Sequence, residues 1–154
     1  MKRIAVMFLL TWCMGRPAEA GGPELRFNRE GKFKIVQFTD VHFRYGNPAS
    51  DIALERINEV LDAENPDFVI FTGDVIYSAP AEQGMRTVLE LVAKRKIPFG
   101  VVCGNHDDEQ GMSRGELLEV IRTIPYNLTA RADGISGETN FILPVKSSCG
   151  DKAA

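Results

Sequence analysis

Three short apolar runs, each followed at once by a polar cluster, constrain the fold of this chain more than any other feature. The runs span residues 33–39, 68–72 and 97–103. They are rich in the aromatic and β-branched residues that favour strands. Amphipathic stretches with helical spacing follow them, at residues 51–64, at residues 82–95 and after Ser113. This alternation predicts an α/β fold that starts as a parallel β-α-β-α-β unit with right-handed crossovers.

Local signals indicate where the expected helices begin and end. Ser50 stands at the N-cap position of the first helix, and Asn65 with Pro66 ends it. Ser113 and Glu116 match a capping box that opens the third helix. A last strand is expected at residues 140–143, because these residues are again mostly apolar.

The first twenty residues differ in character from the rest of the chain. Two basic residues precede an almost unbroken apolar run over residues 4–13, and a small-x-small motif follows at residues 18–20. This order is typical of a secretory signal peptide, and the run is shorter than the roughly 20 residues that span a bilayer. A buried element of the domain and a lipid anchor on Cys13 are the alternatives. We therefore expect residues 1–20 to be removed and residues 21–154 to be exported, to the periplasm or outside the cell, without a stable membrane anchor.

Composition limits the partners and the role of the cysteines. The formal net charge is −3, and lysine and arginine form no stripe, so nucleic acid is not expected as the principal partner. Hydrophobic residues make up 44% of the chain, which excludes disorder over its whole length. Beyond the leader only Cys103 and Cys149 remain, too few for a disulfide framework, so a free thiol is the simplest interpretation of each, with a disulfide partner of Cys149 in further sequence as the alternative.

The polar clusters after the three runs are expected to meet. The first supplies Asp40 and His42, the second Asp74, and the third Asn105 and His106. Because the carboxyl ends of neighbouring parallel strands lie along one edge of a sheet, these side chains should converge. Carboxylate, imidazole and amide oxygen form a donor set that suits Zn, Mn or Fe better than Ca. The sequence therefore predicts a metal site at this edge.

The spacing within the clusters supports this interpretation. In an extended segment residues i and i+2 point the same way, so Asp40 and His42 should reach one ion together. Gly73 and Gly104 let the backbone turn sharply beside it. Asp-x-His alone is common in loops and Gly-Asp alone is common in turns, whereas the Gly-Asn-His-Asp of residues 104–107 is fairly specific, its alternative being a turn with a surface histidine. Their occurrence at three successive strand ends carries the prediction.

These motifs resemble the first three motifs of the calcineurin-like metallophosphoesterases, in particular the secreted purple-acid-phosphatase-like branch. The resemblance covers nearly all of residues 25–154. The stretches that carry it are residues 33–42, 71–77, 104–109, 113–116 and 143–148. It implies that the chain is the N-terminal half of a four-layer αββα sandwich, with residues 21–154 forming the N-terminal part of the phosphoesterase domain.

The resemblance also implies a function and a role for each site residue. The protein would hydrolyse phosphate esters, either monoesters or diesters, by means of two metal ions and a metal-bound hydroxide. Asp40 and His42 would bind the first ion, Asp74 would bridge both ions, and Asn105 would bind the second. His106 would contact the phosphate as acid or charge stabiliser. Asp107 would orient His106.

Two departures from the family pattern leave alternatives open. Asp74 and Tyr77 also match the Asp-x-x-Tyr of true purple acid phosphatases, whose tyrosine binds ferric iron, but those enzymes lack a histidine at the position of His42. The family's later motifs, a lone histidine and a Gly-His-x-His pair, have no counterpart, because the only histidines are His42 and His106. We therefore expect the C-terminal part of the domain to be absent and the chain to be inactive alone. The alternative is a truncated, non-catalytic chain with at most weak metal binding.

Overall fold

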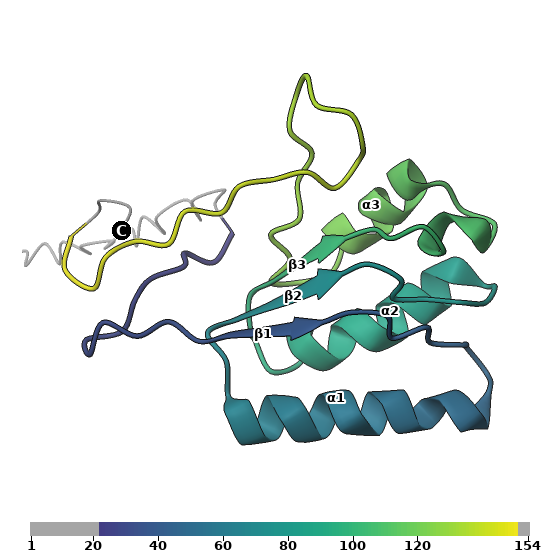
Figure 1. Cartoon of the computed structure of the whole chain (residues 1–154), viewed down its shortest axis with the longest axis horizontal. Coiled ribbons are helices and arrows are strands. Elements are labelled where there is room, and N and C mark those ends of the chain that lie inside the picture. The colour runs from purple at the N-terminus through teal and green to yellow at the C-terminus, as the bar shows by residue number, and fades with distance from the viewer. Residues whose placement is uncertain (1–21, 151–154) are drawn as a thin grey trace, which may run out of the picture.

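The structure is a computed structural model that describes residues 22–150, so the expected signal peptide and its cleavage site lie outside the described residues. The strands are β1 (Ile35–Phe38), β2 (Phe68–Thr72) and β3 (Phe99–Val102). The helices are α1 (Asp51–Glu64), α2 (Ala81–Ala93) and α3 (Arg114–Arg122), and the short 3-10 turns are η1 (Pro48–Ser50) and η2 (Asp107–Glu109). Strands and helices alternate in the predicted order (Figure 1).

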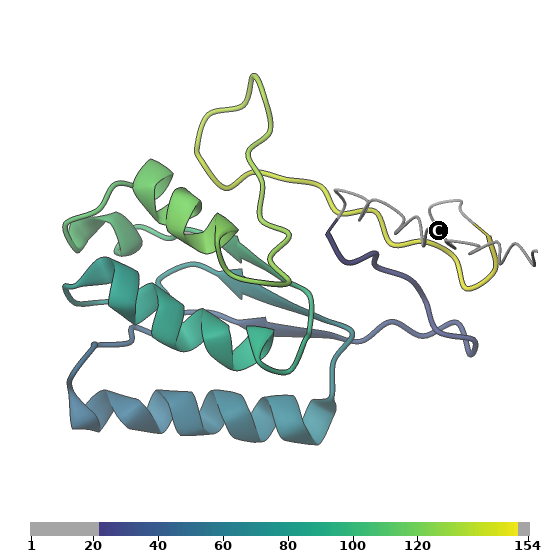
Figure 2. The ribbon, with the colours of Figure 1, turned by 180° about the vertical axis from the view of Figure 1, so that it is seen from behind.

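The three strands form one parallel sheet in the order β1-β2-β3, as the sequence predicts. The helices pack together on one face of it, the face turned toward the reader in Figure 2. Cross-strand partners on this face are apolar in every strand, and β2 contributes the fully buried Val69 and Phe71. They pack against buried side chains of α1 and α2 such as Leu61 and Met85. The hydrophobic effect therefore fixes which face of the sheet the helices cover.

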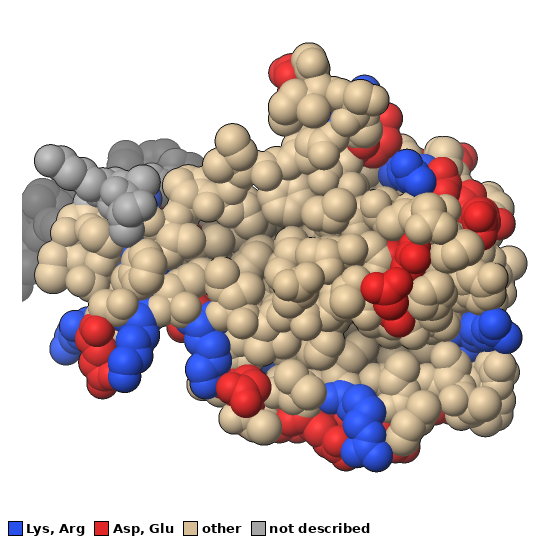
Figure 3. All heavy atoms as spheres, viewed as in Figure 1, with Lys and Arg blue, Asp and Glu red and all other residues tan. Residues whose placement is uncertain are grey.

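The opposite face of the sheet is open. Here Ile35 is 55% and Val102 37% exposed, although a parallel sheet normally has both faces covered. Phe141 lies over β3 on this side, because a Cβ built on Gly100 would come within 2.9 Å of its ring. Figure 3 shows that lysine, arginine and acidic side chains surround this face and are sparse at its centre. The described residues therefore supply one sheet with a single helical layer, which is the arrangement expected for one half of the four-layer sandwich that the resemblance implies.

Most of the predicted local signals are confirmed. α1 and β2 have the predicted bounds, and β1 and β3 are slightly shorter than predicted. The capping box of α3 is present, with Ser113 Oγ accepting from the Glu116 N–H and the Glu116 carboxylate accepting from the Ser113 N–H. Ser50 is the N-cap residue of α1 but makes no capping bond, since its Oγ accepts from the Arg44 N–H instead.

The strand predicted at residues 140–143 is wrong. These residues form no ladder, because the outer edge of β3 is already satisfied by other groups. The Val101 and Cys103 N–H groups donate to the hydroxyls of Thr129 and Thr139, at 2.9 and 3.0 Å. Threonine side chains thus take the positions that a fourth strand would fill. Among residues 22–150 no helix is long and apolar enough to cross a membrane.

Candidate metal centre

The loops after β1 and β2 run side by side beyond the sheet edge. The Asp40 N–H donates to the Gly73 carbonyl at 3.1 Å, and the His42 N–H donates to the Asp74 carbonyl at 2.9 Å. The Phe43 N–H continues the series to the Val75 carbonyl at 3.0 Å. The backbone hydrogen bonding between β1 and β2 thus continues beyond the strands into the two loops. It brings Asp40, His42 and Asp74 close together.

The backbone that presents these side chains differs from the sequence-based expectation. Asp40, His42 and Asp74 have φ angles of 52°, 48° and 52°, so each is in the left-handed region. The expectation that Asp40 and His42 belong to an extended segment is therefore wrong, although the two side chains do converge. Positive φ is uncommon outside glycine, and clusters of such residues are typical of functional sites. The hydrogen bonds to the neighbouring loop hold this conformation.

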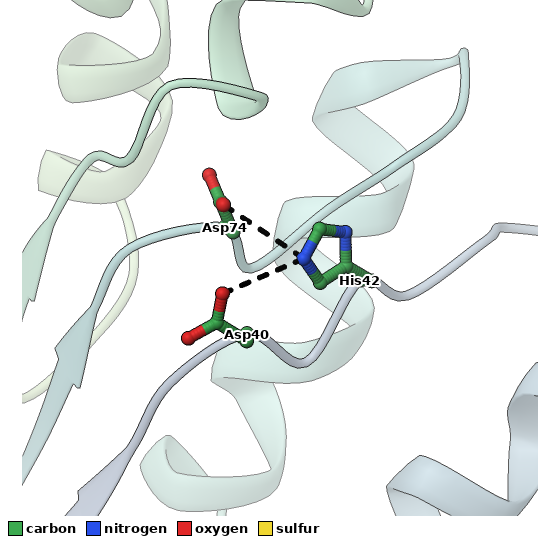
Figure 4. A group of neighbouring side chains, drawn as sticks. All are labelled: Asp40, His42 and Asp74. Atoms are coloured by element: carbon green, nitrogen blue, oxygen red, sulfur yellow. Dashed lines mark ion pairs between the residues drawn. The ribbon is translucent and has the colours of Figure 1, made fainter.

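The three side chains form a compact group of metal-binding donors (Figure 4). His42 Nε2 lies 3.6 Å from Asp40 Oδ1 and 3.7 Å from Asp74 Oδ2. One ligand atom from each residue lies within 4.8 Å of the others. The Asp74 side chain is 11% exposed, whereas that of Asp40 is 63% exposed, so the group opens to solvent on one side. Two carboxylates and an imidazole are a fitting donor set for a transition metal ion.

The buried carboxylate of Asp107 supports the loop that carries Asp74. Its Oδ2 accepts from the N–H groups of Asp74 and Gly104, at 3.0 and 2.7 Å. Its Oδ1 accepts from the Ile76 N–H at 3.0 Å. Asp107 is 0% exposed, so this carboxylate takes the place of water for three backbone donors. It joins the loops after β2 and β3.

The partner of His106 is a correction to the sequence analysis. We expected Asp107 to orient His106, but both oxygens of Asp107 bind backbone N–H groups. The Nδ1 atom of His106 pairs instead with Glu109 Oε2, at 2.6 Å. The sequence signal for this contact is the i, i+3 spacing of His106, the N-cap residue of η2, and Glu109, the last residue of η2, which one helical turn brings together. The backbone N–H of His106 donates to Asp74 Oδ1 at 2.9 Å, which ties His106 to the metal group.

Glu109 favours the protonated form of His106. The hydrogen bond that the His106 ring donates to the Glu109 carboxylate raises the pKa of His106, burial opposes this, and the negative charges of Glu109, Asp74 and Asp107 add to it. A raised pKa means that the imidazolium persists to higher pH. We expect Glu109→Gln to lower the pKa of His106, because the neutral amide no longer favours the charged ring. The measurement is an NMR titration of the His106 ring protons. A pKa that is the same or higher in Glu109→Gln would contradict this role, and Asp108→Asn serves as the control.

Asn105 and Tyr77 lie beside this group in different ways. Asn105 is exposed, and its side chain makes no hydrogen bond to another residue of the described range, so its amide oxygen can accept a ligand. The Tyr77 ring is 5.1 Å from that of His42 and 5.0 Å from that of His106, measured between centroids. The His42 and His106 rings are 5.5 Å apart. Tyr77 therefore packs against both histidines at the edge of the site.

Cys103 is not a reactive thiol. It follows β3, and burial raises its pKa to about 11, with the negative charge of Asp107 as the second cause. The thiol is therefore protonated at neutral pH, and a protonated thiol is a poor metal ligand and nucleophile. Neither Cys103 nor Cys149 forms a disulfide in the described part of the chain.

Comparison with known proteins decides the family. The family model of the calcineurin-like phosphoesterases matches residues 33–147, which include all three loops of the site. The chain belongs to the calcineurin-like phosphoesterase family. The group that could hold a metal ion, formed by Asp40, His42 and Asp74, lies within the matched residues.

Relatives of this family member include proteins of the purple-acid-phosphatase-like branch and others. Phosphatase DCR2 of Saccharomyces cerevisiae is 38% identical over 155 residues, which cover 86% of this chain and 27% of the yeast protein. The probable inactive purple acid phosphatase 29 of Arabidopsis thaliana is 29% identical over 158 residues, 88% of this chain and 41% of the plant protein. The UDP-2,3-diacylglucosamine pyrophosphatase LpxG of Chlamydia muridarum is 32% identical over 94 residues, 60% of this chain and 27% of LpxG. This calcineurin-like chain therefore spans less than half the length of these relatives.

Proposed function

We propose that this chain provides the metal-binding edge of a two-metal hydrolase of phosphate esters, either monoesters or diesters. The observation that carries the proposal is the convergence of Asp40, His42 and Asp74 from two loops, with ligand atoms within 4.8 Å of one another. The family match supports the reaction class. Of these residues Asp40 and His42 would hold the first ion, Asp74 would bridge to a second, and Asn105 would bind that second ion.

The ions, Fe, Zn or Mn, would supply an activated water and neutralise charge on the phosphoryl oxygens. The chain's own residues contribute positioning and a proton. His106 is held beside Asp74 by its backbone and oriented by Glu109, so its ring can donate a hydrogen bond or a proton to a phosphate oxygen. Asp107 keeps the Asp74 loop in place through the backbone.

The second candidate function is metal binding without catalysis. It is favoured by relatives named as probable inactive purple acid phosphatases, such as numbers 14 and 29 of Arabidopsis thaliana. The small number of ligands points the same way, because two ions with four to six ligands each need more donors than Asp40, His42, Asp74 and Asn105. We propose that the remaining ligands lie outside residues 1–154 and that this chain alone hydrolyses phosphate esters negligibly.

Metal binding tests the proposed site directly. We expect the chain to bind Mn²⁺ or Zn²⁺ in equilibrium dialysis and Asp74→Asn to weaken this binding about tenfold, since an amide oxygen is a neutral and weaker ligand. Tyr77→Phe is the matched control, because it keeps the ring packing against His42 and His106. Equal losses in both variants would favour the tyrosine as a ligand, and no metal binding by the wild type would exclude the site.

Hydrolysis separates the two candidate functions. In a form that carries the additional histidines, metal-dependent turnover of an aryl phosphate and of a diester identifies a hydrolase. Metal binding without turnover of either substrate identifies the non-catalytic alternative.

We also propose export to the periplasm or the cell exterior, supported by the order of charge, apolar run and cleavage motif in residues 1–20. A secreted product that still begins at Met1 would contradict it.

A further inference from the structure

Arg44 occupies an unusual position directly after the metal-binding segment. It follows His42 by two residues, and its Cζ lies 5.0 Å from the centroid of the Tyr77 ring. The same Tyr77 ring contacts His42 at 5.1 Å. A guanidinium over an aromatic face is held by cation–π attraction, which limits its rotamers even though the residue is exposed. Arg44 is therefore a pre-positioned positive charge one ring away from a metal ligand.

Among residues 22–150 no carboxylate forms an ion pair with Arg44. Within the described residues the other arginines, Arg29 excepted, each pair with a carboxylate. These pairs are Arg26–Glu24, Arg56–Glu59, Arg86–Glu82, Arg95–Asp62, Arg114–Asp108, Arg122–Glu119 and Arg131–Glu138. Arg29 lies before β1, at the end of the sheet opposite the site. Arg44 is thus the arginine beside the metal group whose full charge is available to a ligand.

A small pocket joins Arg44 to the metal group. Its volume is about 220 Å³, and its lining consists of His42, Arg44, Asn47, Ala49 and Ser50. No acidic residue is among these five. Asn47 Oδ1 accepts from the Ala49 N–H at 3.1 Å, which leaves the Asn47 amide hydrogens to donate. Ser50 Oγ accepts from the Arg44 N–H at 3.0 Å, which leaves the Ser50 hydroxyl hydrogen to donate. The side chains of Asn47 and Ser50 therefore keep N–H and O–H groups that can donate to a ligand beside the positive charge of Arg44.

We propose that this pocket binds a second phosphoryl group of the substrate, so that the preferred substrates are organic phosphates that carry another phosphate group. The inference rests on the proposed function, because the first phosphoryl group must lie at the metal group. A guanidinium fork with amide and hydroxyl donors matches the oxygens of a phosphate. A phosphate ester without a second anionic group would leave Arg44 and its neighbouring donors without a partner.

The test compares two non-hydrolysable probes by calorimetry on the Mn²⁺-loaded chain. Methylphosphonate carries one phosphoryl group, and methylenediphosphonate carries two. We expect the wild type to bind methylenediphosphonate about tenfold more tightly than methylphosphonate, as a charge-assisted bidentate contact implies. Arg44→Gln should remove this preference and leave methylphosphonate binding unchanged. Arg29→Ala, which removes one positive charge far from the site, should keep the preference and controls for the change in net charge. Chelation of Mn²⁺ by the probe alone would leave the preference intact in Arg44→Gln.

The outcomes separate this inference from the proposed function. Suppose that Mn²⁺ binds but the wild type binds both probes equally, or that Arg44→Gln still prefers methylenediphosphonate. Either result overturns the second-phosphate pocket and leaves the metal site in place. If the wild type binds no Mn²⁺, the proposed function fails and the pocket fails with it. Should Arg44→Gln also lose Mn²⁺, the variant is misfolded and Arg44→Lys decides. Lysine keeps the charge but lacks the planar fork of arginine. We therefore expect the preference of Arg44→Lys for methylenediphosphonate to be about threefold smaller than that of the wild type, and an equal preference overturns the proposal.

Discussion

Replacing Asp107 by alanine will destabilise the protein by about 3 kcal/mol or more, because three buried backbone N–H groups lose their acceptor at once. These donors are the N–H groups of Asp74, Ile76 and Gly104, and the carboxylate that serves them is 0% exposed. An unsatisfied buried donor costs on the order of 1–3 kcal/mol, and entry of water offsets only part of three such losses. The free energy of unfolding, measured with urea, checks this.

Two further variants make the Asp107 prediction specific. Asp107→Asn keeps one oxygen, so we expect a loss smaller than that of Asp107→Ala. The neighbouring Asp108 is partly exposed and pairs with Arg114, at 3.3 Å between Oδ2 and Nε. Because exposed ion pairs contribute about 0–1 kcal/mol, Asp108→Ala should cost less than about 1 kcal/mol. Similar losses for Asp107→Ala and Asp108→Ala would show that the three backbone contacts do not hold the loops together.

Replacing Gly104 by alanine will disrupt the metal group itself. A Cβ at this position would lie 2.5 Å from the Asp74 backbone nitrogen and would also overlap its carboxylate Oδ1. The Asp74 backbone and its carboxylate cannot easily move away from this Cβ. The Asp74 N–H donates a hydrogen bond to Asp107, and Asp74 Oδ1 accepts one from the His106 N–H. We expect Mn²⁺ or Zn²⁺ affinity to fall about 10- to 100-fold, more than in Asp74→Asn, which keeps an oxygen in place. The overpacking itself should cost about 1–3 kcal/mol of stability. Equilibrium dialysis and urea unfolding measure the two effects.

Gly115 provides the matched control for this substitution. It lies in α3, and a Cβ there would meet Glu138 Cδ at 3.9 Å, an ordinary contact. Gly115→Ala should therefore leave metal affinity unchanged and stabilise the helix by about 0.5–1 kcal/mol. If Gly104→Ala behaves like Gly115→Ala, the close approach of the two loops is not required for the site.

The sequence alone was sufficient to predict the three helices, the three strands of the sheet and the convergence of Asp40, His42 and Asp74, but not the irregular structure of residues 140–143. Apolar periodicity determines α1 and β2 to the residue, because the amphipathic and fully apolar patterns are long and are bounded by clear stop signals. The strand–helix alternation determines a parallel sheet, since right-handed crossovers are nearly obligatory. From these two facts it follows that Asp40, His42 and Asp74 meet at one edge, which the structure confirms.

Only the tertiary structure decided how these residues are held and which neighbours act on them. Asp40 and His42 converge through left-handed backbone that is paired with the loop after β2, so no local pattern could reveal it. Asp107 binds backbone groups of the loops after β2 and β3, while Glu109 takes the role expected of Asp107. Thr129 and Thr139 occupy the edge of β3 and prevent the last predicted strand. The physical reason is common to all of these: a polar group bonds whichever partner the packed chain brings within about 3 Å, and that partner is set by packing between segments far apart in sequence.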